Sequence, residues 1–195
     1  MLNKQEIIRF FDGLAPQWDA EMIRDDAVIG RILDGAGVKA GAHVLDVACG
    51  TGVLVPDYLA RDVASVTGVD ISPEMVKIAR EKFPQENVRF LCRDVETLEP
   101  GARYDVVMVY NAFPHFPDPE GLIHTLSALL KPGGTLTVAH GMSRAAIDRH
   151  HEDTASRVSR GLMSEDDLAA IFARELEVTV KISDARMYQV TGRKA

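Results

Sequence analysis

The sequence predicts a doubly wound α/β fold with a mostly parallel sheet and an antiparallel last strand. Short, continuous runs rich in Val and Leu recur along the chain, as is typical of strands buried on both faces of a parallel sheet. Segments with helical periodicity separate most of these runs, and this alternation indicates a doubly wound sheet. Only one or two residues near Asp184 join the last two runs, so we expect a hairpin with an antiparallel final strand.

Two helices are expected before the first strand. Residues 3–14 carry an apolar helical face, with Asn3 in position to cap the helix and Pro16 in position to end it. A second helix is expected over residues 17–34, ended by Gly35. Its inward face would consist of five apolar residues, namely Met22, Ile23, Ile29, Ile32 and Leu33.

Seven segments are expected to be strands, and helices link most of them. The expected strands cover residues 43–48, 66–70, 88–92, 104–110, 135–140, 175–183 and 185–194. The expected linking helices cover residues 54–62, a segment starting at Ser72, residues 119–130 and residues 164–174. Ser72 favours a helix start because its side chain can cap, and Pro73 suits the first helical position.

Length and charge limit the kind of protein. A chain of 195 residues fits one domain of roughly 150 residues with a modest elaboration. The 22 basic and 29 acidic residues give a net charge of −7, which argues against binding of nucleic acid or anionic lipid through an extended basic surface. No run approaches the roughly 20 apolar residues that cross a bilayer. The start of the chain lacks the apolar core of a secretory signal, so we expect a cytoplasmic protein without a membrane span.

Polar residues gather where the expected parallel strands end. In open α/β sheets, ligands bind outside the carboxyl ends of the strands. These ends carry the segment 46–52, with its two glycines, and then Asp70, Asp94, Asn111 and His140. We therefore expect the functional site along this edge.

The turn after the first strand favours an adenosine site over a dinucleotide site. Glycines at 50 and 52 let the backbone pass close to a ligand. The third glycine of a dinucleotide-binding motif would fall at position 55, which is Val55. Asp70 lies 20 residues after Gly50, a spacing at which a carboxylate accepts hydrogen bonds from ribose hydroxyls.

Five ordered segments between residues 43 and 140 resemble the motifs of a known family. They read VLDVACGTG, GVDISPEMV, FLCRDVETL, YDVVMVYNAF and LLKPGGTLTV. In order and spacing they are similar to the class I S-adenosylmethionine-dependent methyltransferases. The resemblance implies a seven-stranded sheet of the Rossmann-like methyltransferase kind and S-adenosylmethionine as the cofactor.

The resemblance also implies roles for individual residues. Asp46, Ala48 and Gly50 would surround the methionine part, and Gly52 would shape the turn. Asp70 would bind the ribose. The adenine would lie among residues of two motifs. Ile71 and Met75 would lie against it, and Asp94 would accept from its amino group with the amide of Val95 nearby. Asn111 would lie under the cofactor with His115 nearby. At Ala48 the family more often has glycine.

The N-terminal segment resembles the opening of several small-molecule methyltransferases, including those of quinone biosynthesis. Its sequence FFDGLAPQWD places Phe11, Ala15, Trp18 and Asp19 at the positions of the pattern F-x-x-x-A-x-x-[YW]-D. This implies a lid in which Phe11 and Trp18 contact the cofactor. The alternative is that Trp18 anchors the first helices on the core.

Three histidines are candidates for chemistry beside the reacting methyl group. His140 ends a strand, and His150 and His151 follow on an expected helix over residues 143–152. One or more of them would act as a general base or contact the acceptor. A metal site of His140 with His150 or His151, completed by Asp148 or His115, is an alternative, as is an unrelated polar surface helix. The neighbouring arginines, Arg144, Arg149, Arg157 and Arg160, would suit an acidic acceptor.

These expectations combine into one functional hypothesis. A single domain would consist of an N-terminal lid (1–40), a cofactor-binding core (41–141), a substrate-side insertion (142–163) and a closing helix and hairpin (164–195). It would transfer a methyl group to a small molecule as a monomer or homodimer, without metal or nucleic acid. Asn111-Ala112-Phe113-Pro114 differs from the signature of base-amine methylation. The alternatives are a cofactor-binding sensor or accessory protein, and an RNA- or protein-modifying enzyme that needs a partner.

Overall fold

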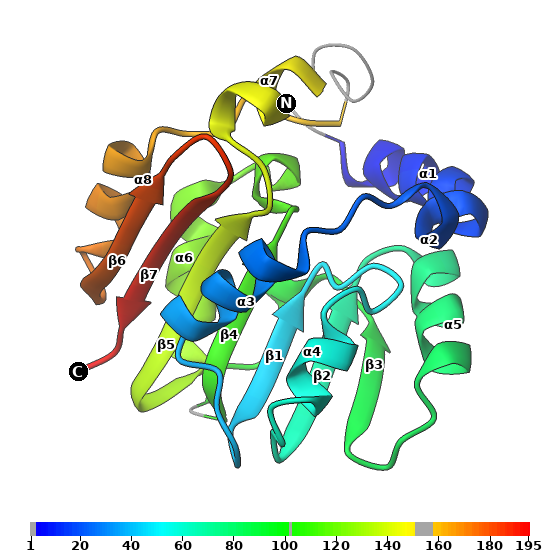
Figure 1. Ribbon diagram of the computed structural model, residues 1–195, viewed down its shortest axis with the longest axis horizontal. Coiled ribbons are helices and arrows are strands. Elements are labelled where there is room, and N and C mark those ends of the chain that lie inside the picture. Colours follow the sequence, from blue (N-terminus) through cyan, green and yellow to red (C-terminus); the bar gives the residue numbers. More distant parts are fainter. Residues whose placement is uncertain (1–2, 102, 151–157) are drawn as a thin grey trace.

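A seven-stranded mixed sheet forms the centre of the molecule (Figure 1). The computed structural model describes residues 3–101, 103–150 and 158–195. The strands lie in the order β3-β2-β1-β4-β5-β7-β6. Their bounds are β1 His43–Val47, β2 Ser65–Asp70, β3 Val88–Cys92, β4 Tyr104–Tyr110, β5 Leu130–His140, β6 Glu177–Ser183 and β7 Tyr188–Arg193. β7 runs antiparallel to both of its neighbours, and β1 to β5 pair in parallel, which confirms the predicted fold class.

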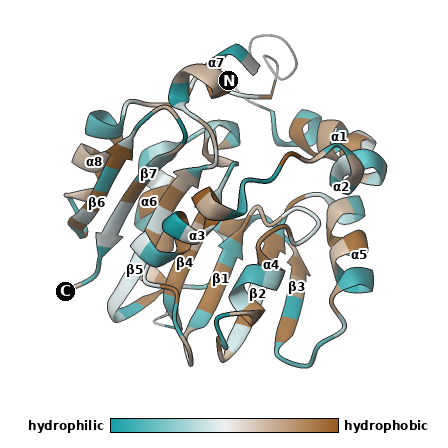
Figure 2. Ribbon diagram, viewed as in Figure 1, coloured by the Kyte–Doolittle hydropathy of each residue, from teal (hydrophilic) through white to brown (hydrophobic). Residues whose placement is uncertain are grey.

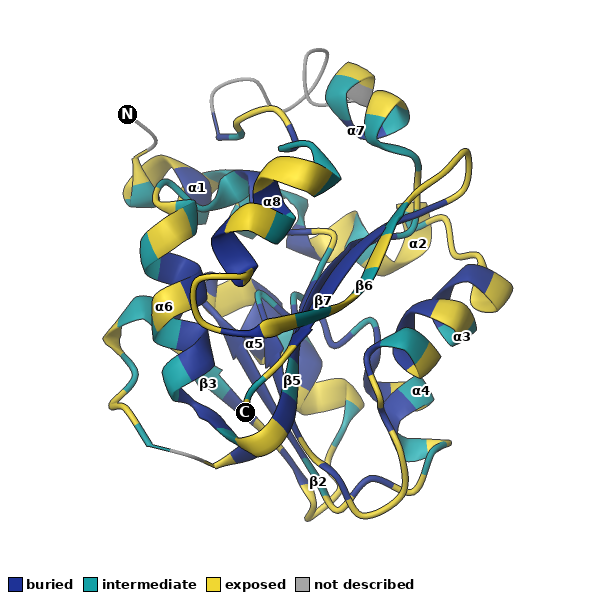
Figure 3. Cartoon of the chain, turned by 90° about the vertical axis from the view of Figure 1, so that its left-hand side faces the viewer, coloured by how far each residue is buried: buried dark blue, intermediate teal, exposed yellow. Residues whose placement is uncertain are grey.

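Helices cover the sheet on both faces. The helices α3 (Asp26–Gly35), α4 (Val55–Leu59) and α5 (Pro73–Lys82) pack with Val44 on one face. The helices α6 (Pro119–Ala128) and α8 (Glu165–Phe172) pack with Leu45 on the other. Successive strand residues point to opposite faces, so the continuous apolar runs serve both layers. Figures 2 and 3 show apolar residues along the strands and buried residues facing inward from the helices.

Side-chain caps start the helices where the sequence places them. Asn3 accepts a hydrogen bond from the amide of Gln5 at the start of α1 (Lys4–Leu14). Ser72 accepts from the amide of Met75 at the start of α5, and Ser164 caps α8 in the same way. Each cap satisfies an amide that has no partner within the first helical turn. The helix starts predicted at Asn3 and Ser72 are therefore confirmed.

The single helix predicted over residues 17–34 is wrong. The structure has a 3₁₀ turn (Ala15–Gln17), the short helix α2 (Trp18–Glu21), an extended linker and then α3. The side chain of Asp25 accepts from the amide of Val28 at 3.1 Å and thereby starts a new helix. Ile23, predicted to face inward, lies in the linker and is 98% exposed.

Other boundaries shift for local reasons. The hairpin between β6 and β7 has four linking residues rather than one or two, because Asp184 accepts from the amides of Arg186 and Met187 and organises a longer turn. The strand predicted to begin at residue 135 begins at Leu130, with an irregular register beside Tyr104. The predicted helix over 54–62 is shortened to α4. In the part of the chain that the structure describes, no helix is long and apolar enough to span a bilayer.

Candidate functional site

Asp70, at the carboxyl end of β2, closes the glycine turn that follows β1. Its Oδ2 atom accepts from the amide of Gly50 and its Oδ1 atom from the amide of Ser72, both at 2.8 Å. Burial raises the pKa of the Asp70 carboxyl group, although the hydrogen bonds from these backbone amides oppose the shift. A carboxylate offers about four lone-pair sites, so Asp70 can still accept from a further donor.

The backbone of the turn is held in an unusual conformation. Ala48, Gly50 and Gly52 have φ angles of 52°, 53° and 83°. A Cβ atom at Gly52 would lie 2.7 Å from the ring of Phe83, so this position requires glycine on steric grounds as well. Ala48 adopts the same left-handed region with a side chain, at a cost of about 1–2 kcal/mol. Such strain is found where a turn must present its backbone to a ligand.

A second buried acid lies below the turn. Asp46 is 2% exposed, and burial raises the pKa of its carboxyl group to about 8, with the nearby Asp70 carboxylate adding to the shift. The hydroxyl of the fully buried Tyr58, on α4, acts in the opposite direction. Among the described residues, neither Asp46 nor Asp70 forms an ion pair. A cation brought to this cluster would favour the ionised form of both acids.

The N-terminal segment lies over the turn. The Nε1 atom of Trp18 lies 3.8 Å from the position that a Cβ atom on Gly50 would take, and the Sδ atom of Met75 lies 3.9 Å from it. The Trp18 Nε1 donor is buried and finds no acceptor among the described residues. A group bound at the turn that carries an acceptor would satisfy this donor.

Asp19 links the N-terminal segment to the turn. Its carboxylate accepts from the hydroxyl of Thr51 and from the ammonium of Lys82, both at 2.6 Å. Burial would raise the pKa of Asp19, but these two hydrogen bonds bring it below its usual range. Ala15, the remaining small residue of the N-terminal motif, is buried. Within the N-terminal motif, Asp19 therefore binds Thr51 and Lys82, and Ala15 is buried. Phe11 and Trp18 are the aromatic residues of the motif.

Helix α1 makes further contacts along the same edge (Figure 1). The Nζ atom of Lys4 lies 2.5 Å from Asp94 and also pairs with Glu96. Asp12 accepts from the Ser72 hydroxyl at 2.5 Å, at the start of α5. The ring of Phe11 packs edge to face on Trp18 and, 5.0 Å away, on His115. These contacts hold the segment across the carboxyl ends of β1, β2 and β3.

The remaining residues of the predicted cofactor set lie around this core. Asn111, with a φ angle of 53°, accepts from the amide of Gly141 at 3.0 Å and ties the end of β4 to that of β5. Val95 is buried in the core beside β4. Ile71 packs against the cluster formed by Ile7 of α1 and Val158. The predicted residues are thus brought to one edge of the sheet.

The candidate histidines are in separate places. His140, at the end of β5, is 2% exposed and its ring packs edge to face on Tyr188. His115 contacts the carbonyl of Val158 through Nδ1 at 2.8 Å. The helix α7 (Arg144–His150) follows β5, but the side chain of His150 and all of His151 and Arg157 lie outside the described residues. Within the described ranges, no group of three or more His, Cys, Asp or Glu side chains is placed to hold a metal ion.

Sequence reasoning missed three residues of the site. Lys4 and Asp12 contact the site from α1, 90 and 60 residues away in sequence from their partners Asp94 and Ser72. Burial raises the pKa of Asp46, and Tyr58, fully buried on α4, acts to lower it. Nothing in the sequence marks these pairs, because each contact depends on how a helix packs and not on a spacing within one motif.

Comparison with known proteins supports a family assignment. Residues 44–134 match a family described as a methyltransferase domain. The ubiquinone biosynthesis O-methyltransferase of Coxiella burnetii is 35% identical over 144 residues, covering 69% of this chain and 61% of that protein. The chain therefore matches less than two thirds of the length of this curated relative.

Solved structures share the fold over almost the whole chain. One comes from a complex between the Haloferax volcanii Trm112 methyltransferase activator and a methyltransferase; it has a TM-score of 0.84 at 20% identity and covers 96% of this chain and 97% of its own. The N-methyltransferase NodS of Bradyrhizobium japonicum, solved with S-adenosyl-L-homocysteine, has a TM-score of 0.74 at 15% identity. That match covers 98% of this chain and 97% of NodS. At such identities the likeness shows the fold.

Proposed function

The chain belongs to the class I S-adenosylmethionine-dependent methyltransferases, and on this premise we propose that it transfers the methyl group of S-adenosylmethionine to a small-molecule acceptor. The observation that carries the proposal is the Asp70 carboxylate, which closes the glycine turn beside the buried Asp46. The turn, the two acids and the covering aromatic residues form one continuous set at the carboxyl edge of the sheet.

The chemistry of these residues fits the cofactor. S-adenosylmethionine carries a positive sulfonium and a positive ammonium group, and both would favour ionisation of Asp46 and Asp70. The remaining acceptor capacity of Asp70 suits a ribose hydroxyl. Trp18 would cover the sulfonium from the N-terminal side, where its Nε1 donor finds no protein acceptor among the described residues.

The names of the relatives support the acceptor class that we propose. The name of the Coxiella burnetii protein, an O-methyltransferase of ubiquinone biosynthesis, supports a hydroxyl oxygen on a small organic molecule. When the oxygen attacks the methyl carbon, the C–O bond forms, the C–S bond breaks and the hydroxyl proton must leave. Positioning supplies much of such catalysis. We assign the proton to a base among His140, His150 and His151, without a metal.

The N-terminal residues 1–40 would serve as the lid and residues 142–163 as the acceptor side of the domain, completed by the core 41–141 and the closing segment 164–195. The lid assignment is supported by the contacts of Lys4, Asp12 and Asp19, which come from one segment and reach Asp94, Ser72 and Thr51. A cofactor would enter between this segment and the turn.

Calorimetry tests the proposal directly. We expect S-adenosylhomocysteine to bind in a 1:1 ratio and to change the emission of Trp18, the single tryptophan of the chain, because the ligand would lie against its ring. Trp18→Phe provides the control, since it should abolish the optical signal while calorimetry still detects binding. Absence of binding by calorimetry would overturn the proposed function, and binding without transfer to any small hydroxylated acceptor would favour a sensor or accessory protein.

Removing the Lys4 side chain should make the Asp94 carboxylate more available to the adenine of a bound cofactor. In the structure Lys4 occupies Asp94, the residue expected to accept from the adenine amino group. A partly exposed ion pair contributes up to about 1 kcal/mol, so Lys4→Ala is expected to raise the affinity for S-adenosylhomocysteine by up to about fivefold. Lys77→Ala, which removes an exposed lysine paired with Glu74 on α5, is the matched control and should leave affinity unchanged. A weaker complex with Lys4→Ala would instead mean that Lys4 holds the bound cofactor.

A further inference from the structure

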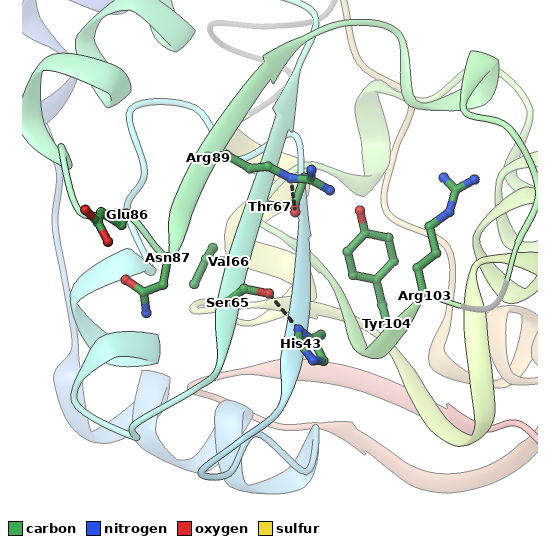
Figure 4. Close-up of a pocket in the computed structure, with 9 residues that line it drawn as sticks. All are labelled: His43, Ser65, Val66, Thr67, Glu86, Asn87, Arg89, Arg103 and Tyr104. Atoms are coloured by element: carbon green, nitrogen blue, oxygen red, sulfur yellow. Dashed lines mark hydrogen bonds between the residues drawn. The ribbon is translucent and has the colours of Figure 1, made fainter.

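A second pocket lies at the opposite edge of the sheet. It has a volume of about 300 Å³ and is lined by the first residues of β1 and β2 and by residues at and just before the starts of β3 and β4 (Figure 4). These residues are His43, Ser65, Val66, Thr67, Glu86, Asn87, Arg89, Arg103 and Tyr104. Thr67 and Asp70 are three residues apart on β2, so the pocket is separated from the glycine turn by about 10 Å of strand.

The pocket is open because the connection between β3 and β4 has no long helix to cover this part of the sheet. His43, Ser65, Thr67 and Arg89 share the sheet face of Leu45, since paired residues of parallel strands point the same way. Farther along the sheet, α6 and α8 cover this face. In the described part of the connection from β3 to β4, residues 93–101 and 103, only Val95–Thr97 is helical. The beginning of β2 and β3 is therefore left open on this side.

Most polar side chains that line the pocket are positively charged or neutral. Figure 4 shows the guanidinium groups of Arg89 and Arg103 on either side of the Tyr104 ring. Arg89 donates through Nε to the Thr67 hydroxyl at 2.9 Å, which leaves its terminal nitrogen atoms available. Neither arginine forms an ion pair with any described residue. Glu86 is the single acidic residue of the lining, in a protein whose net charge is −7.

The floor of the pocket adds an apolar surface. Tyr104 is 6% exposed and packs in the core on the same sheet face as Leu45, so the part of its side chain that faces the pocket forms a fixed base beneath the charged groups. The fully buried side chain of Val66 packs with Val44 on the opposite face. His43 and Ser65 are held together by a hydrogen bond of 2.8 Å at one side. A ligand here would meet a ring face below and guanidinium donors around its anionic end.

We propose that this pocket binds a small phosphate monoester with a flat organic group. Guanidinium groups match the geometry of phosphate oxygens and bind them through paired hydrogen bonds. Two such groups suit a dianion better than a singly charged carboxylate. The volume is at the lower limit of ligand pockets, which suits a compact ligand whose organic part packs on Tyr104. This site is separate from the proposed methyl-transfer site and does not depend on it.

Phenyl phosphate is a suitable probe. Calorimetry on the full chain is expected to show saturable 1:1 binding of phenyl phosphate, with weaker binding of inorganic phosphate and of phenylacetate. Arg89→Gln and Arg103→Gln are each expected to weaken binding at least about tenfold, because each removes a charged hydrogen-bond donor. Arg193→Gln removes an exposed arginine from β7 and lowers the net charge equally, so it should bind phenyl phosphate as the unmodified chain does.

Two further measurements locate the binding. Amide chemical shifts should change at His43, Thr67 and Tyr104 when phenyl phosphate is added, and saturation with S-adenosylhomocysteine should not displace it. The proposal would be overturned by the absence of saturable binding, by equal effects of Arg193→Gln and Arg89→Gln, or by displacement with S-adenosylhomocysteine. Failure of S-adenosylhomocysteine to bind, by contrast, would refute the proposed function and leave this pocket to be judged by phenyl phosphate alone.

Discussion

Replacement of Asp70 by alanine is expected to weaken binding of S-adenosylhomocysteine by about 10- to 150-fold. The ribose hydroxyls would lose a charged acceptor, and hydrogen bonds to charged groups contribute about 1.5–3 kcal/mol. The turn would also lose the acceptor for the amides of Gly50 and Ser72, so the backbone that approaches the cofactor would no longer be fixed. Calorimetry gives the affinity, and thermal unfolding reports whether the variant is folded.

A second variant separates charge from shape at this position. Asp70→Asn keeps the size and one oxygen acceptor but removes the negative charge, so its affinity should fall between those of alanine and aspartate. Asp166→Ala is the matched control, because it removes an exposed carboxylate paired with Lys181 on the far side of the sheet. Unchanged affinity in folded Asp70→Ala and Asp70→Asn proteins would remove Asp70 from the site.

The second large effect concerns the pH dependence of stability. The pKa of Asp46 is about 8 in the folded protein and near 3.8 in the unfolded chain. The folded state therefore holds a proton that the unfolded state releases. The contribution of Asp46 to stability is fully present below pH 3.8 and is lost as the pH rises toward 8. Within this window the loss is about 1.4 kcal/mol per pH unit for this one group.

Asp46→Asn should remove this slope. The amide has nearly the same shape and does not titrate, so the variant is expected to be more stable than the unmodified chain at pH 7.5 and to bind S-adenosylhomocysteine more weakly. Denaturant unfolding between pH 5 and pH 7.5 measures the slope. Asp105→Asn is the control: burial would raise the pKa of Asp105, but its hydrogen bond from Lys131 lowers it overall, so its titration lies below this range. Equal slopes in the unmodified chain and Asp46→Asn would exclude a protonated Asp46.

Much of the fold can be predicted from the sequence, because the strands are specified locally. The continuous apolar runs, the cap at Ser72 and the short final connection each carry their own signal. The secondary structure before β1 was harder to predict. Met22 and Ile23 match a helical period, yet the chain is extended there, because Asp25 starts a new helix and α2 follows the turn of the N-terminal segment. Periodicity alone does not report such an interruption.

Part of the site could likewise be predicted from the sequence, and part could not. Gly50, Asp70 and Asp94 were predicted because each lies at the end of a strand or within three residues of it, and parallel strands end at one edge. Lys4 and Tyr58 were not predicted, since their contacts arise from helix packing. The base among His140, His150 and His151 stays a prediction, because His140 is described but the other two side chains lie outside the described residues.

Burial, with the nearby Asp70 carboxylate adding to the effect, holds the pKa of Asp46 at about 8, so its carboxyl group carries a proton at pH 7. No cation among the described residues pairs with it. S-adenosylmethionine would supply that cation. Its arrival would release the Asp46 proton to solvent, so the total charge of the buried cluster would stay the same before and after binding. Cofactor uptake in this protein would then be an exchange of cations, in which a proton leaves as a sulfonium enters.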